Sequence, residues 1–155
     1  MATILFVEDD NELRIRTLEF LCHFYPQDTF IEAASFQEAV AQYNGYNPDI
    51  IISDFKYSGH MDKGAFNKQG SGGIDLFEFT IDDGVPFAFL SGTEAEEIIG
   101  ALQDRDTSLI ISRELIFQKT RVTEEAATMM GALKKLAAER PKDPSAALKA
   151  QKNLG

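Results

Sequence analysis

Acidic side chains stand directly after two short apolar runs of this sequence. Asp54 follows the run 48–53, Pro-Asp-Ile-Ile-Ile-Ser, and the acids Glu-Asp-Asp at 8–10 follow the apolar run 4–7. Two such strands lying side by side would bring three or four carboxylates together, and carboxylates crowd in this way mainly around a divalent cation. These acids at the strand ends are therefore the first candidates for chemistry.

Two further polar residues follow later apolar strands. Ser91 comes after the run 85–90, and Lys119 comes after the run 115–118. Because ligands of open parallel sheets bind beyond the carboxyl ends of the strands, all of these groups are expected at one edge. Acids, one hydroxyl and one ammonium suit a phosphoryl group bound with magnesium, since phosphoryl transfer needs mainly positioning and charge neutralisation.

The chemistry of each side chain assigns it a role in such a site. Mg²⁺ prefers one or two carboxylates together with phosphate oxygens, so Asp9 and Asp54 are expected as direct ligands. Glu8 would bind through water or orient the site. Lys119 would offset the surplus negative charge and reach a phosphoryl oxygen, and Ser91 would donate a hydrogen bond to another.

Short apolar runs alternate with amphipathic stretches, which is the pattern of an α/β protein with a doubly wound, five-stranded parallel sheet. The strands are expected at 3–8, 29–33, 49–54, 85–90 and 115–118. Helices are expected at 11–25, 35–42, 74–81, from 93 onward and at 123–139. Right-handed crossovers and the strand order 2-1-3-4-5 make the first and third strands neighbours. Glu8, Asp9 and Asp54 then converge where the strand order reverses.

Capping residues and a long loop mark the boundaries of these elements. Ser35 and Thr93 each precede a glutamate by three residues, which predicts that both cap a helix. The segment 56–73 is rich in glycine and polar residues and is longer than ordinary loops, so it is expected to be functional or disordered. The chain is expected to form one domain over 1–140, with 141–155 as an appendage too short for an effector domain.

Composition excludes several classes of function. The chain has 155 residues, 44% of them hydrophobic, and a formal net charge of -10, which argues against direct nucleic-acid binding. Its apolar runs are far shorter than the roughly 20 residues of a membrane span. No membrane insertion and a cytoplasmic location are therefore expected. The single cysteine, Cys22, lies among apolar residues and is expected in the core.

Four blocks of the sequence together resemble the signature blocks of bacterial two-component response-regulator receiver domains. The blocks are 4–10, 48–54, 87–93 and 117–119. The resemblance covers about residues 3–139 and implies the flavodoxin-like fold of a stand-alone receiver. It also implies a signalling role in a phosphorelay, with a histidine kinase or phosphotransfer protein as donor and a downstream protein as target.

The resemblance extends to individual site residues. It implies Asp54 as the phosphoryl acceptor, Glu8 and Asp9 as the acidic pair that holds Mg²⁺, and the backbone carbonyl of Lys56 as a further metal ligand. The phosphoryl-contacting positions of the family, one on the fourth strand and one on the fifth, match Ser91 and Lys119. By this resemblance the chain catalyses only its own phosphorylation and slow dephosphorylation.

The chain departs from the family pattern in three places. Thr120 stands where the family has a proline after a cis bond, so a trans bond or a shifted loop is expected. Ile116 stands at the position of the switch aromatic, and Phe117 should point to the opposite face of the sheet. The segments 56–73 and 103–113 are longer than usual and could reshape partner contacts.

Two other functions remain open on the sequence. The first is a receiver-like adaptor that binds its partner independently of phosphorylation, since the usual aromatic read-out is missing. The second is a Mg²⁺-dependent phosphohydrolase, but Asp54 lacks the Asp-x-Asp partner and the sequence has no phosphate-cradling Gly-x-x-x-x-Gly-Lys. His60 and Asp62 lie on the glycine-rich loop without further His or Cys, and they are expected to be exposed to solvent.

Overall fold

The computed structural model describes residues 1–57 and 71–140. In these ranges the strands form one five-stranded parallel sheet with the order β2-β1-β3-β4-β5, which confirms the predicted topology. The strands are β1 (Thr3–Val7), β2 (Thr29–Ala33), β3 (Ile50–Ser53), β4 (Phe87–Ser91) and β5 (Ile116–Gln118). Val7 pairs with Ser53 at the ends of β1 and β3. The residues that follow these two strands therefore leave the sheet side by side.

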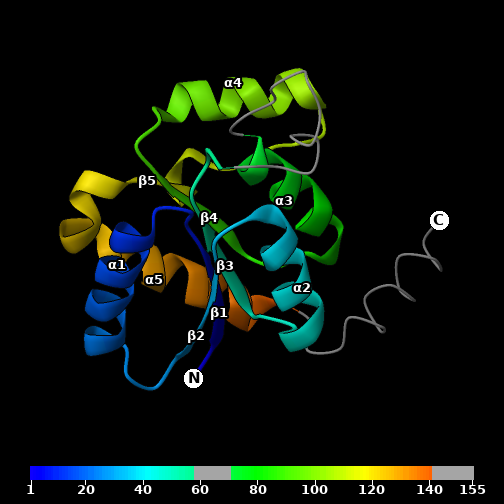
Figure 1. Ribbon diagram of the computed structural model, residues 1–155. Coiled ribbons are helices and arrows are strands. Elements are labelled where there is room, and N and C mark those ends of the chain that lie inside the picture. The colour runs from blue at the N-terminus through cyan, green and yellow to red at the C-terminus, as the bar shows by residue number, and fades with distance from the viewer. Residues whose placement is uncertain (58–70, 141–155) are drawn as a thin grey trace.

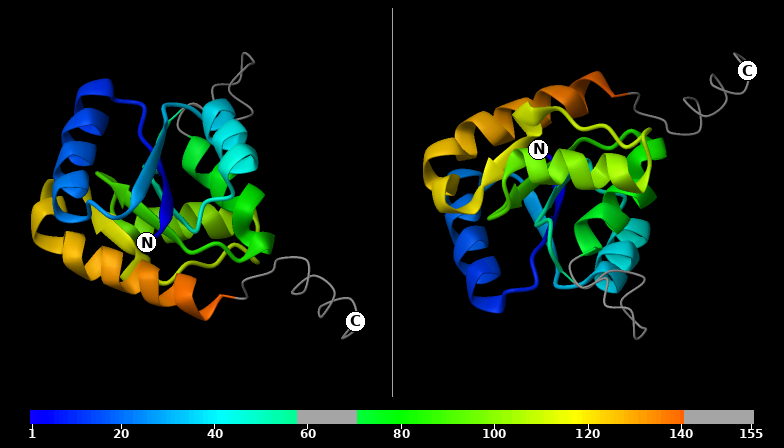
Figure 2. Two further views of the ribbon diagram at one scale, coloured as in Figure 1. Left: turned by 90° about the horizontal axis from the view of Figure 1, so that it is seen from below. Right: turned by 90° about the horizontal axis from the view of Figure 1, so that it is seen from above.

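Helices cover both faces of the sheet, as predicted for a doubly wound fold. They are α1 (Asn11–Phe24), α2 (Phe36–Tyr46), α3 (Gly72–Thr80), α4 (Ala95–Arg105) and α5 (Val122–Glu139). Figures 1 and 2 show α1 and α5 on one face and α2, α3 and α4 on the other. Three 3₁₀ turns, η1 (Ile81–Asp83), η2 (Arg113–Leu115) and η3 (Lys119–Arg121), complete the described elements.

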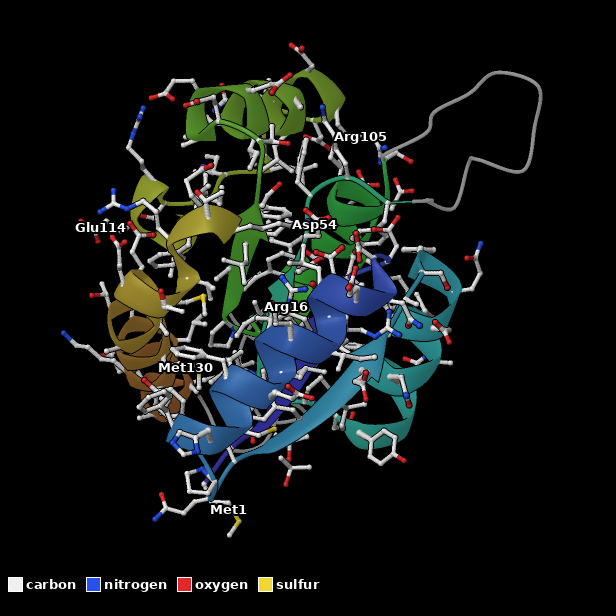
Figure 3. All side chains as sticks on the ribbon, turned by 60° about the vertical axis from the view of Figure 1, so that its left-hand side comes forward. Met1, Arg16, Asp54, Arg105, Glu114 and Met130 are labelled. Carbon is white, nitrogen blue, oxygen red and sulfur yellow. The ribbon has the colours of Figure 1, made fainter. Side chains whose placement is uncertain are left out.

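Each face of the sheet has its own hydrophobic core. Ile51 packs with Phe89 and Ile98 on the side of α2, α3 and α4. Its neighbour Ile52 packs on the opposite side with Met130 of α5, which Figure 3 shows between that helix and the sheet. Because β3 is buried on both faces, every residue in it must be apolar or small, and this explains its uninterrupted run of isoleucines.

The two predicted helix caps have different outcomes. The Ser35 hydroxyl accepts a hydrogen bond from the Glu38 backbone N–H at 3.1 Å and caps α2. The prediction that Thr93 caps α4 is wrong. The N-cap residue is Glu94, and its side chain makes no capping hydrogen bond. Thr93 is buried instead, and its own N–H donates to the Ser91 hydroxyl oxygen at 3.1 Å.

Helix α3 begins two residues earlier than its apolar pattern predicts. Its first residues pack directly against the chain that follows β3: the Gly72 N–H donates to the Tyr57 carbonyl at 2.8 Å, and the Gly73 N–H donates to the Phe55 carbonyl at 3.1 Å. A Cβ atom on Gly73 would lie 2.5 Å from the Phe55 carbonyl oxygen. Glycine is thus required here for close approach of two backbones.

Other parts of the predicted loop and appendage lie outside the described residues. These are 58–70, with His60 and Asp62, and 141–155. Within the described ranges, no helix combines the length and the apolar character that a membrane crossing needs.

The prediction that Cys22 lies in the core is wrong. Its side chain is exposed on α1. The buried face of this helix consists of Thr17, Leu18 and Leu21, and the residue after Leu21 is turned about 100° away from that face because an α-helix has roughly 3.6 residues per turn.

A buried ion pair fastens α5 to the end of the sheet opposite the acidic cluster. The Asp28 side chain is only 1% exposed, and its Oδ2 atom lies 2.6 Å from Lys134 Nζ. Its Oδ1 atom accepts a hydrogen bond from the Ala2 N–H at 2.8 Å. The carboxylate therefore has one ionic partner and one backbone donor.

We expect Lys134→Met to lower the free energy of unfolding by about 1–3 kcal/mol, because it leaves the buried Asp28 carboxylate without its cation. Urea unfolding at neutral pH measures the difference. Lys135→Met is the matched control, because Lys135 is exposed on the same helix and should change the stability by less than about 0.5 kcal/mol. Equal losses in the two variants would contradict a stabilising role for the Asp28 pair.

Candidate functional site

Three carboxylates converge beyond the carboxyl ends of β1 and β3. Glu8, Asp9 and Asp54 each offer one oxygen, and these three oxygens lie within 4.8 Å of one another. Glu8 and Asp54 are 3% and 6% exposed, whereas Asp9 is exposed to solvent. Figure 3 shows Asp54 at the end of the sheet opposite Met1. A group of hard oxygen donors with one open side fits Mg²⁺, which keeps several waters or substrate oxygens among its ligands.

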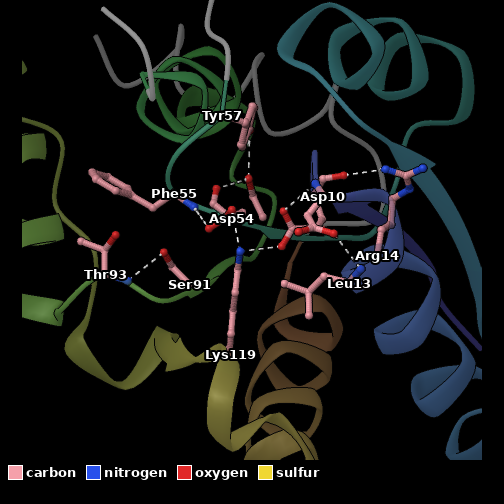
Figure 4. A network of polar contacts seen from close by, with 11 residues as sticks. Asp10, Leu13, Arg14, Asp54, Phe55, Tyr57, Ser91, Thr93 and Lys119 are labelled. Carbon is pink, nitrogen blue, oxygen red and sulfur yellow. Dashed lines mark hydrogen bonds and ion pairs between the residues drawn. The ribbon is translucent and has the colours of Figure 1, made fainter.

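Lys119, the residue after β5, joins two of these acids. Its Nζ atom lies 2.6 Å from Glu8 Oε1 and 2.8 Å from Asp54 Oδ2 (Figure 4). Burial alone would lower the pKa of Lys119, but its hydrogen bonds to Asp54 and Glu8 outweigh this effect and raise the pKa. The lysine therefore stays charged and partly neutralises the acidic cluster.

The carboxyl group of Glu8 has a strongly shifted pKa. Its pKa is raised to about 7, chiefly because the group is buried and also because the negative charge of Asp54 lies close, although the hydrogen bond from Lys119 acts in the opposite direction. The Asp10 N–H, which donates to Glu8 Oε2 at 3.2 Å, lowers it slightly. Perturbed acids of this kind, in contact with a specific charged partner at a strand end, are typical of functional sites.

Hydrogen bonds fix the chain around Asp54. Its Oδ1 atom accepts from the Phe55 N–H at 2.7 Å, and its backbone carbonyl accepts from the Ser53 hydroxyl at 2.7 Å. The Tyr57 hydroxyl lies 2.9 Å from the Ser53 oxygen. Because the single Ser53 proton is already donated to Asp54, Tyr57 must be the donor in this second bond. Burial raises the pKa of Tyr57, which keeps it protonated for that role.

The Ser53–Tyr57 pair could not be predicted from the sequence, since no periodic pattern links the two residues. Lys56, whose carbonyl the family resemblance assigns to the metal, lies between Phe55 and Tyr57 and has an exposed side chain. The carbonyls of both neighbours accept hydrogen bonds from the first residues of α3. The backbone carbonyls one residue before and one residue after that of Lys56 are therefore held by the start of α3.

Ser91, at the end of β4, lies beside the cluster but is engaged elsewhere. Its side chain is buried, and its oxygen accepts from the Thr93 N–H (Figure 4). Among the hydrogen bonds of the described residues, the Ser91 hydroxyl is paired with Thr93 and not with Asp54. The structure thus brings Glu8, Asp54 and Lys119 into direct contact and leaves Ser91 at the edge of the network.

The residues in and after β5 that differ from the receiver pattern have the geometry expected from the sequence. The described residues contain no cis peptide bond, so Lys119 and Thr120 are joined in the trans form. Ile116 packs against the core on the side of α4, whereas Phe117 is buried in the core on the side of α1 and α5. No aromatic side chain of β5 therefore faces α4.

Comparison with known proteins finds no matching family model and no matching curated protein. Several solved structures do match. The N-terminal domain of an uncharacterized protein from Wolinella succinogenes is 21% identical, with a TM-score of 0.58 over 89% of this chain and 99% of that one. A response regulator receiver domain protein from Clostridium thermocellum is 16% identical, with a TM-score of 0.60 over 90% of this chain and 100% of that one.

A third similar structure is the receiver domain of a Francisella response regulator. It is 15% identical, with a TM-score of 0.57 over 90% of this chain and 98% of that one. Such similarity at low identity establishes the fold. The chain therefore has the flavodoxin-like receiver fold that its four sequence blocks predict.

Proposed function

We propose that this chain is a receiver that acts as a phosphorylation switch in a two-component phosphorelay, with Asp54 as the phosphoryl acceptor. The observation that carries the proposal is the contact of Lys119 with both Asp54 and Glu8, at 2.8 and 2.6 Å, beside the exposed carboxylate of Asp9. The likeness to solved receiver domains supports it. A histidine kinase or phosphotransfer protein is then the donor, and a downstream protein is the target.

The arrangement of charges suits attack by a carboxylate on phosphorus. An Asp54 oxygen forms a bond to phosphorus while the bond between phosphorus and the donor nitrogen breaks. The electron pair of the broken bond stays on the donor nitrogen. Lys119 is placed to neutralise charge on the phosphoryl oxygens, and Ser91 can donate to one of them. Glu8, Asp9, Asp54 and the Lys56 carbonyl would hold Mg²⁺, which supplies further neutralisation of the phosphoryl group when bound.

This function predicts a covalent adduct with a small-molecule donor. Incubation with acetyl phosphate and Mg²⁺ should add one phosphoryl group to the protein, and intact-mass spectrometry measures it. Borohydride reduction of the adduct should convert residue 54 to homoserine, which peptide mass spectrometry locates. Chelation of Mg²⁺ with EDTA should prevent the modification. An unmodified mass at every donor and Mg²⁺ concentration would contradict the proposal.

A second candidate is an adaptor whose partner binding does not depend on phosphorylation. Two observations favour this function. Ile116, which packs on the side of α4, has no aromatic ring, and Phe117 is buried in the core on the side of α1 and α5. Two-dimensional NMR spectra with and without beryllofluoride and Mg²⁺ separate the two functions. A switch should show shift changes that extend into α4 and α5, whereas an adaptor should show changes only around the acidic cluster.

A further inference from the structure

In the turn between β4 and α4, both the backbone N–H and the backbone carbonyl of Thr93 are hydrogen-bonded. The Thr93 N–H donates to the Ser91 hydroxyl oxygen at 3.1 Å, and the Thr93 carbonyl accepts from the Gln118 side-chain amide at 3.1 Å. Ser91 and Gln118 are themselves paired in register at the ends of β4 and β5. A continuous chain of hydrogen bonds thus runs from Gln118 through Thr93 to Ser91.

This turn receives no support from a cap on its own helix. The N-cap residue of α4, Glu94, makes no side-chain capping bond, and Thr93 is buried and bonded to the neighbouring strands. Gln118 is half-buried and comes from β5, 25 residues further along the chain. The amide of Gln118 therefore supplies from another element the hydrogen bond that positions Thr93.

The direction of these bonds determines what Ser91 can do. A serine hydroxyl has one proton to donate and lone pairs to accept. The Thr93 N–H is donated to the Ser91 oxygen, so the Ser91 proton remains available for an acceptor. That acceptor, under the function proposed above, is an oxygen of the phosphoryl group on Asp54.

We propose that Gln118 is a positioning residue for phosphoryl transfer to Asp54: its amide fixes Thr93, and Thr93 holds the Ser91 oxygen so that the hydroxyl acts as a donor. This inference rests on the proposed phosphorylation of Asp54. It requires no contact between Gln118 and the phosphoryl group. Because Gln118 directly precedes Lys119, one strand end then positions both the hydroxyl and the ammonium of the site.

A double-mutant cycle tests the route through Ser91. The rate of phosphoryl uptake from acetyl phosphate is measured at saturating Mg²⁺ for the wild type, Gln118→Leu, Ser91→Ala and the double variant. Gln118→Leu should be about threefold to tenfold slower than the wild type, the effect of one hydrogen bond. The double variant should react at the same rate as Ser91→Ala, since a residue that acts through Ser91 has no effect once that hydroxyl is gone. The Mg²⁺ concentration for half-maximal rate should not change.

Gln42→Leu is the matched control. The Gln42 amide also donates to a backbone carbonyl, that of Glu32, at 3.1 Å, but it lies on α2, away from Ser91. Removal of the Gln42 amide should leave the rate of phosphoryl uptake unchanged. Thermal unfolding of each variant verifies that it is folded, and Gln118→Met replaces Gln118→Leu if the leucine variant does not fold.

Each remaining outcome overturns the inference in a distinct way. A wild-type rate for the Gln118 variant would show that its amide does not position the site. Independent, multiplicative losses of rate in the double variant would show that Gln118 does not act through Ser91. If the wild-type protein itself forms no adduct, the proposed function fails and the role of Gln118 fails with it.

Discussion

Asp54→Asn should take up no phosphoryl group from acetyl phosphate under conditions in which the wild-type protein gains one. The substitution keeps the size of the side chain and an oxygen that can accept from the Phe55 N–H, a bond of 2.7 Å in the wild type. It removes the negative charge that makes the side chain a nucleophile. Intact-mass spectrometry of both proteins after the same incubation measures this all-or-none difference.

The variant should remain folded, so the loss of uptake is a loss of chemistry. Lys119 keeps its contact with Glu8, which is 2.6 Å long and independent of Asp54. The substitution also removes a negative charge beside the buried Glu8 carboxyl group, whose pKa that charge raises. The loss of one ion pair with Lys119 is thereby partly offset by relief of repulsion between carboxylates. Circular dichroism and thermal unfolding should therefore show a folded variant.

A conservative change at an acid outside the site is the control. Asp104 is exposed on α4, and Asp104→Asn should be modified at the wild-type rate. A stable adduct on Asp54→Asn would show that another residue is the acceptor, and Asp9 and Glu8 are the nearest carboxylates. Peptide mapping of that adduct would then identify the acceptor directly.

The sheet could be predicted from the sequence because burial on both faces leaves a continuous apolar run, as at 50–52, and because crossover handedness restricts the strand order. The helix starts could not all be predicted. Gly72 and Gly73 look like loop residues in the sequence, but the missing Cβ of Gly72 leaves room for the Tyr57 ring, and that of Gly73 lets α3 approach the backbone of Phe55. Thr93 has the spacing of a cap, but a hydrogen bond from Gln118 fixes it in another role.

The charged part of the candidate site was predictable for the same topological reason. Parallel strands deliver Glu8, Asp54 and Lys119 to one edge, and the structure places them in contact. The polar supports of this site were not predictable. The partners of Tyr57 and Gln118 depend on strand register and on the path of a turn, which periodicity does not report. The one usable signal was a polar residue, Gln118, at the end of a short apolar strand.

Gly73→Ala should strongly destabilise the protein and disturb the loop that carries Asp54. An added Cβ would lie 2.5 Å from the Phe55 carbonyl oxygen, 2.7 Å from the Phe55 Cα and 2.8 Å from the Asp54 carbonyl oxygen. These are backbone atoms, so no change of rotamer relieves the overlap. We expect the free energy of unfolding to fall by about 3 kcal/mol, as for overpacking at a rigid position. Urea unfolding measures the change.

A glycine-to-alanine substitution at a position with open space around it should raise the free energy of unfolding instead of lowering it. Gly131 lies within α5, where an added Cβ would point into open space, so Gly131→Ala should stabilise the protein by about 0.5–1 kcal/mol through helix propensity alone. Stabilisation by Gly73→Ala as well would contradict the close approach of α3 to the chain after β3.

The effect of Gly73→Ala on chemistry should exceed its effect on the folded fraction. The atoms displaced by the new methyl group include the Asp54 carbonyl oxygen, which the Ser53 hydroxyl fixes at 2.7 Å. Moving this peptide group shifts the acceptor carboxylate relative to Lys119. At a temperature at which the variant is still folded by circular dichroism, phosphoryl uptake should therefore remain slower than in Gly131→Ala. Equal rates in the two folded variants would show that the start of α3 supports the fold without positioning Asp54.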